Sequence, residues 1–68
     1  MLTERLELIE YEIEKVTKEL ISLYSQIAIK GNASPANEAL YHTKKSALAS
    51  LTHARIEIMA LLEQNPNT

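Results

Sequence analysis

Apolar residues in the first half of the chain recur in alternating steps of four and three positions. This spacing places them along one side of an α-helix and is typical of a coiled-coil seam. No Gly or Pro interrupts the pattern before Gly31, so it predicts one helix over residues 3–29. At 1.5 Å per residue such a helix is about 40 Å long. The predicted seam comprises Leu2, Leu6, Ile9, Ile13, Val16, Leu20, Leu23 and Ile27.

A short segment, residues 30–34, separates this helix from a second one. Gly31 favours the left-handed backbone conformation that ends many helices. Ser34 can cap the next helix with its hydroxyl, and Pro35 suits the first helical position, where its missing N–H costs nothing. We therefore predict a second helix over residues 35–64 and a frayed tail over residues 65–68. The whole chain, residues 1–68, is expected to form one domain.

The second helix has a seam of its own, again in steps of four and three. Because the connection is short, the two helices should be antiparallel neighbours. If facing residue numbers sum to 67, every seam residue from Leu6 onward has a partner, and two large residues face an alanine. The predicted fold is all-α: a two-helix antiparallel hairpin with coiled-coil-like packing, which completes a bundle with partner chains. The second seam comprises Leu40, Lys44, Ala47, Leu51, Ala54, Ile58 and Leu61.

A further set of apolar residues lies outside both predicted seams. Two helices cannot cover residues on both sides of a shared seam, so this face is expected to bind another molecule. Self-association into a four-helix bundle and capture of a foreign helix both fit such a face. The predicted partner-binding residues are Ile21, Tyr24, Tyr41, Leu48, Ile56, Met59 and Leu62.

Composition narrows how so short a chain can be stabilised. Hydrophobic residues make up 46% of it, and the absence of Cys excludes disulfides and thiolate metal sites. Because small domains gain only ~3–5 kcal/mol from their own core, oligomerisation is the remaining means of support. No apolar run approaches the ~18 residues of a membrane span, and the N-terminus lacks a signal-peptide pattern. We therefore expect neither membrane insertion nor export through a cleaved signal.

The negative net charge argues against nucleic-acid binding. The net charge is −2, and six of the nine acidic residues lie in residues 1–19, where they complement the dipole of the first helix. Lys44, Lys45 and Arg55 form a weakly basic flank with His42 and His53 on the second helix. A symmetric dimer would double this flank, so RNA binding is an alternative, although no basic stripe supports it.

Residues that could carry chemistry are sparse. His42 and His53 are eleven positions apart, too far to share a metal ion within one helix. Glu38 and His42 lie one turn apart and supply only two of the four ligands that a structural metal site needs. The chain has no Asp for an Asp-based nucleophilic triad. We expect no enzymatic activity, no metal and no cofactor.

The second helix, with its Ser-Pro start and its Ala-rich, then aliphatic pattern, resembles a known family. The residues that carry the resemblance are Ser34, Pro35, Ala47, Leu48, Leu51, Ala54, Ile58, Leu61 and Leu62. Small helical hairpins of this size serve as export co-chaperones for type III secretion needle subunits, the YscE/EscE-like group. The resemblance spans most of the chain and rests on pattern, without a diagnostic motif.

The resemblance implies a protein-binding function in the bacterial cytoplasm. The hairpin would pair with a tetratricopeptide-type co-chaperone, and together they would hold an aggregation-prone needle subunit until export. The alternatives are a homodimeric four-helix-bundle regulator that binds RNA or protein and, less favoured, a small enzyme. Fold alone does not decide among them.

Overall fold

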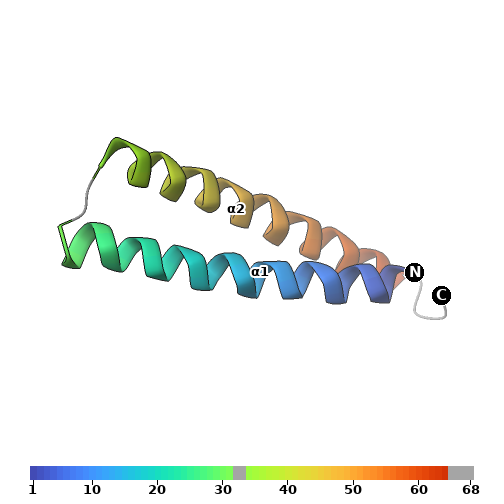
Figure 1. The fold of residues 1–68 in the computed structure, drawn as a ribbon. Coiled ribbons are helices and arrows are strands. Elements are labelled where there is room, and N and C mark those ends of the chain that lie inside the picture. Colours follow the sequence, from blue (N-terminus) through green and yellow to red (C-terminus); the bar gives the residue numbers. More distant parts are fainter. Residues whose placement is uncertain (32–33, 65–68) are drawn as a thin grey trace.

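Two antiparallel helices joined by a short connection make up the protein in its computed structural model (Figure 1). The structure describes residues 1–31 and 34–64. Helix α1 spans Leu2–Tyr24 and continues into a π-helical turn, η1, at Ser25–Ile29, and helix α2 spans Pro35–Gln64. Over the two described ranges the backbone contains no strand. The all-α hairpin predicted from the heptad spacing is confirmed.

The helix ends at the connection follow the local signals in the sequence. Gly31 has a φ of 70°, the left-handed conformation predicted for it. The backbone N–H of Asn37 donates to Ser34 Oγ at 3.1 Å, which caps the first turn of α2, and Pro35 is the first residue of that helix. The predictions for residues 32–33 of the loop and for the tail, residues 65–68, lie outside the described residues.

The last helical turn before the connection is wider than an α-helical turn. The N–H of Lys30 donates to the carbonyl of Ser25 at 3.2 Å, five residues back instead of four. The segment predicted as α-helix through residue 29 is therefore helical, but its final turn is π-helical. In this turn Ser25, Gln26 and Ile27 are all partly buried, whereas α-helical geometry would spread three such residues over more than half of the circumference.

On α1 the seam lies where the heptad pattern predicts it. All of the predicted seam residues are buried or partly buried, and Val16 and Leu23 are the most shielded among them. The apolar residues of this helix that lie off the seam are exposed. A single narrow stripe of aliphatic residues therefore determines which side of α1 turns toward α2.

On α2 the side turned toward α1 differs from the prediction. Leu40, Ala47 and Leu61, all predicted on the seam, are exposed. Their sequence neighbours Tyr41, Leu48 and Leu62, assigned to the partner-binding face, are partly buried. The predicted seam of α2 is therefore wrong at these three positions, whereas Lys44, Leu51, Ala54 and Ile58 are partly buried or buried as predicted. Since only every second seam position moves by one residue, α2 is rotated by about 50° from the predicted orientation.

Two ion pairs connect α2 to α1 in the observed orientation. Lys44 Nζ lies 3.2 Å from Glu19 Oε1, and Arg55 Nε lies 3.5 Å from Glu10 Oε2. Both basic side chains are partly buried, so their aliphatic stems lie along the boundary between the helices while their charged ends reach α1. Apolar residues occupy two adjacent faces of α2, and the face that includes Arg55 is the one turned inward.

The lengthwise alignment of the helices is close to the predicted one. Leu20, predicted to face Ala47, lines the same surface hollow as Lys45 and Leu48, which lie on either side of that position in the sequence. The predicted register is therefore correct to within one helical turn. Figure 1 shows the two helices running in opposite directions, with the N-terminus at the end away from the connection.

The hairpin is elongated, and its core is small. Its Cα atoms extend over 51 × 14 × 14 Å, and the radius of gyration is 15.5 Å. A compact chain of this length has a radius of gyration of about 11 Å. In the described part of the chain, only Val16, Leu23 and Ile58 are buried. Neither helix has a stretch long and apolar enough to cross a membrane within the described ranges.

The elongated shape leaves an unusually large surface. The solvent-accessible area is 5197 Å² for a chain of 7.7 kDa. A compact monomer of that mass exposes about 4300 Å². The hairpin therefore has roughly 900 Å² more surface than a compact protein of its size.

Candidate helix-binding face

Four of the seven predicted partner-binding residues surround one shallow hollow of about 310 Å³ near the connection. Ile21 and Tyr24 come from α1, and Tyr41 and Leu48 come from α2. Because both helices contribute, these side chains lie on one side of the hairpin, which we call the front face. An adjoining hollow of about 330 Å³ also includes Tyr24 and Tyr41 and extends toward the connection.

The front face continues to the far end of the hairpin. There Met59 and Leu62 line another hollow together with Leu6 of α1. Met59 follows Leu48 by eleven positions, about three helical turns, so both point to the same side of α2. Ile56 lies one turn before Met59 and belongs to the same side. The structure therefore brings all seven predicted residues to one side of the molecule.

Solvent exposure divides the seven residues into two groups. Tyr41, Leu48 and Leu62 are only partly exposed, because α2 turns them toward α1. The expectation that the hairpin cannot cover the predicted partner-binding face is therefore wrong for these three. The other four are exposed: Ile21 (64%), Tyr24 (58%), Ile56 (58%) and Met59 (44%).

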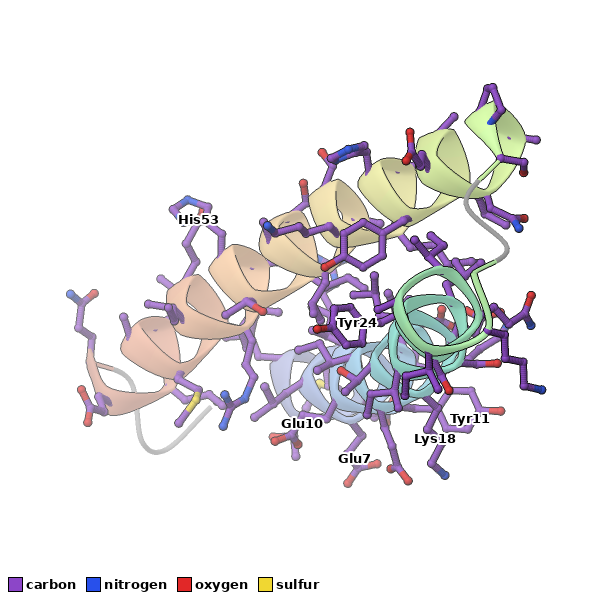
Figure 2. All side chains as sticks on the ribbon, turned by 90° about the vertical axis from the view of Figure 1, so that its left-hand side faces the viewer. Glu7, Glu10, Tyr11, Lys18, Tyr24 and His53 are labelled. Atoms are coloured by element: carbon purple, nitrogen blue, oxygen red, sulfur yellow. The ribbon has the colours of Figure 1, made fainter. Side chains whose placement is uncertain are left out.

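The opposite side of α1 carries a tyrosine of similar exposure. Figure 2 shows Tyr24 and Tyr11 projecting from opposite sides of this helix. Tyr11 is 64% exposed and lies among Glu14, Lys15 and Lys18. The neighbours of Tyr11 are therefore charged, whereas those of Tyr24 include Ile21, Tyr41 and other residues of the front face. The front face thus differs from the surface around Tyr11 in that its apolar side chains border shallow hollows between the two helices. Leu8, Ile29, Leu40 and Leu61 are also exposed, but they do not border these hollows.

Two threonines occupy the middle of the front face. Thr17 lies four positions before Ile21, and Thr52 lies four positions before Ile56, so both share the side of their exposed neighbours. The hydroxyl of Thr17 donates to the carbonyl of Ile13 at 2.7 Å, and that of Thr52 donates to the carbonyl of Leu48 at 2.8 Å. Since both hydroxyl protons are already bonded within their own helix, this region can be buried without leaving an unsatisfied donor.

The spacing of apolar side chains does not by itself place these threonines on the face. The signal in the sequence is that each lies four positions before an apolar residue of the face, Ile21 or Ile56. Arg55 is a further residue of the face that apolar spacing does not reveal, and it lines a hollow there with Glu10, Ile13 and Glu14. Arg55 Nε is shielded from solvent and lies within ion-pair distance of Glu10 without forming a hydrogen bond.

Charge is distributed unequally between the two ends of the hairpin. The terminal half, residues 1–19 and 50–64, contains eight Glu and four basic residues, which gives −4. The connection half, residues 20–49, contains three Lys and one Glu, which gives +2. The hairpin is therefore an electric dipole along its length. On the front face itself, Lys45 and Glu38 border the hollows of the connection half, and Glu10, Glu14, Glu63 and Arg55 border those of the terminal half.

The groups that could carry chemistry are dispersed. His53 Nε2 lies 2.7 Å from Glu57 Oε1 on the exposed surface of α2. Glu38 and His42 border one hollow near the connection. Among the described residues, no three His, Cys, Asp or Glu side chains lie close enough together to hold a metal ion.

The predicted basic flank of α2 is partly neutralised within the hairpin. Lys44 lies within ion-pair distance of Glu19, and Arg55 lies within ion-pair distance of Glu10. Lys45 is exposed. Because phosphate binding depends on uncompensated positive charge, the hairpin offers less of it than the sequence pattern indicated.

Comparisons of this chain with family models, curated proteins and solved structures find no significant match.

Proposed function

We propose that this hairpin is a helix-binding interaction module whose front face packs against a helix of a partner. The observation that carries the proposal is that Ile21, Tyr24 and Met59, all exposed, border shallow hollows between the two helices on a single side of the hairpin. Apolar side chains gathered on one face mark interaction surfaces, whereas scattered ones do not. The small core supports the same conclusion, because a chain with so little buried area gains stability from a partner.

A finer proposal names the partner as an export-bound helical subunit in the bacterial cytoplasm. The hairpin would act there as a co-chaperone, together with a tetratricopeptide-type protein. This proposal rests on the resemblance of the sequence to the type III secretion co-chaperones, and the Ser34 cap with Pro35 at the first position of α2 supports it. The mechanism would be burial: an amphipathic helix laid along the front face is kept from associating with its own kind.

Substitution of the two exposed tyrosines of α1 tests the helix-binding function. Tyr24→Glu places a charge in the front face, whereas Tyr11→Glu makes the same change at similar exposure on the opposite side. The probe is a fluorescent amphipathic peptide with leucine at the a and d positions of each heptad. Binding is measured by fluorescence anisotropy, and the fold of each variant is checked by circular dichroism.

The wild-type chain and Tyr11→Glu should bind the peptide. Tyr24→Glu should bind it roughly tenfold more weakly, which corresponds to a loss of about 1.4 kcal/mol of binding free energy. Equal binding by the two variants would show that the front face is not the helix-binding surface.

Co-expression tests the finer proposal. The chain is produced together with the products of its neighbouring genes, and the complexes are purified. A complex with a tetratricopeptide protein and a small helical export subunit, lost on Tyr24→Glu, is the expected result. If the neighbouring genes encode no secretion component, the co-chaperone proposal is wrong, whereas the helix-binding function still stands on the peptide experiment.

A further inference from the structure

We infer that the front face is covered by a second copy of this chain, arranged so that the connection half of each copy packs on the terminal half of the other. This inference rests on the proposed helix-binding function and names its partner. The assembly is a four-helix bundle with a two-fold axis that crosses the middle of the front face.

The surface area of the hairpin matches what a dimer of this kind buries. A standard protein interface buries about 800 Å² on each partner. The hairpin has roughly 900 Å² of surface beyond that of a compact protein of its mass. Covering one side of the hairpin with another hairpin therefore removes about the excess that its elongated shape creates.

The apolar clusters at the two ends of the front face complement each other. A two-fold axis across the middle exchanges the ends, so the cluster that contains Tyr24 and Tyr41 packs on the cluster that contains Leu6 and Met59 of the other copy. The middle of α1 and η1 lies near Val16, so Thr17 is close to the axis. Its hydroxyl proton is already bonded within α1, which makes it suitable for a dry interface.

Charge selects this arrangement over the one in which like ends coincide. A dimer with like ends together would also match apolar clusters, but it would place −4 beside −4 and +2 beside +2. Exchanging the ends places −4 beside +2, which is attractive at both ends of the bundle.

One charged residue of the front face shows the same complementarity locally. Lys45 lies beside Leu20 and Ile21, about five residues beyond the middle of the first helical segment, and Glu10 lies about equally far before it. The two-fold axis therefore brings Lys45 of one copy to the level of Glu10 of the other.

The absence of Cys allows the arrangement to be measured with a single spin label. Ala36→Cys provides an exposed attachment site in the second position of α2, close to the connection. With the ends exchanged, the two labels of a dimer lie ~40 Å apart, because each is about fifteen residues from the middle. With like ends together they lie ~20 Å apart or less, since only the width of the bundle separates them. Pulsed electron paramagnetic resonance measures the distance, and sedimentation equilibrium measures the mass.

A pair of charge reversals tests the electrostatic part. Lys45→Glu should weaken the dimer by roughly tenfold, because it places an acidic residue beside Glu10 of the other copy. Lys15→Glu is the matched control: it changes the net charge equally, but it lies at the middle of the hairpin beside Tyr11, on the opposite side. Its dissociation constant should stay close to that of the wild type.

A dimeric mass with the longer label distance and the greater sensitivity to Lys45→Glu supports the inference. A dimer with the shorter distance overturns it, as does equal weakening by both lysine variants. A monomer that still binds the leucine peptide through Tyr24 also overturns it but leaves the helix-binding function in place. Only the loss of the difference between Tyr24→Glu and Tyr11→Glu contradicts that function itself.

Discussion

Ser34 illustrates how far a single side chain determines the local structure of this chain. Its hydroxyl accepts the N–H of Asn37, and its carbonyl accepts the N–H of Glu38 at 2.9 Å. Pro35 follows at the one helical position that needs no N–H donor. These interactions act within one turn of the chain, so the start of α2 could be predicted from the sequence alone.

The cap predicts a specific loss of stability. Ser34→Ala should lower the free energy of unfolding by ~1 kcal/mol, because the N–H of Asn37 loses its acceptor. Ser46→Ala makes the same chemical change at an exposed position inside α2, where alanine favours the helix, so it should be neutral or slightly stabilising. Urea denaturation at one fixed protein concentration measures both. A loss at Ser46 as large as that at Ser34 would contradict the capping role.

Gly31 is another residue whose conformation could be predicted locally. Its φ of 70° is costly for residues with a side chain, and a Cβ atom added there would meet nothing within 4 Å. Gly31→Ala should therefore lower the free energy of unfolding by about 1 kcal/mol through backbone strain alone. Gly31→Asn should cost less, since asparagine tolerates this conformation better than alanine does. The same denaturation experiment compares the two variants.

At the scale of the element, the side that faces the other helix could be predicted from the sequence for α1 but only in part for α2. Helix α1 has one aliphatic stripe, and this stripe faces α2 as predicted. Helix α2 has aliphatic residues on two adjacent faces, one that contains Leu40 and Leu61 and one that contains Tyr41 and Leu62. Periodicity within α2 cannot choose between them. The choice depends on how α2 packs against α1, which is a property of the packed pair.

A pair of alanine substitutions tests the rotation of α2. Both Ala47 and Ala54 belong to the seam that the sequence predicted, but only Ala54 is partly buried. Ala54→Leu should therefore lower the free energy of unfolding by ~1–3 kcal/mol through overpacking. Ala47→Leu should change it little, because the added side chain extends into solvent. Equal losses in the denaturation experiment would mean that α2 faces α1 with its originally predicted side.

At the scale of the whole molecule, the candidate site was predictable in part. Its seven residues share one side of the hairpin because heptad spacing and an antiparallel turn place them there. The degree to which α1 covers Tyr41, Leu48 and Leu62 was not predictable, since it follows from the rotation of α2. The contribution of Thr17 to the same face depends on its hydrogen bond to Ile13, which sequence periodicity does not reveal.

The small core makes the thermal stability of the hairpin depend on its partner. If copies of the chain associate through the front face, the melting temperature should rise with protein concentration, because association stabilises only the folded chain. Tyr24→Glu should melt at a lower temperature that does not change with concentration, and Tyr11→Glu should behave as the wild type does. Differential scanning calorimetry over a wide concentration range measures the three. A wild-type melting temperature independent of concentration would contradict self-association.

Salt concentration separates the electrostatic from the apolar contribution to that assembly. The attraction between the −4 terminal half of one copy and the +2 connection half of the other acts across exposed groups, so salt screens it. The dimer dissociation constant should therefore rise as sodium chloride increases from low ionic strength to 1 M, where the screening length is about 3 Å. Sedimentation equilibrium at each salt concentration provides the measurement. Apolar burial alone predicts the opposite trend or none, and in a dimer with like ends together salt would relieve repulsion and lower the dissociation constant. The sign of the salt dependence therefore distinguishes the two arrangements without any substitution.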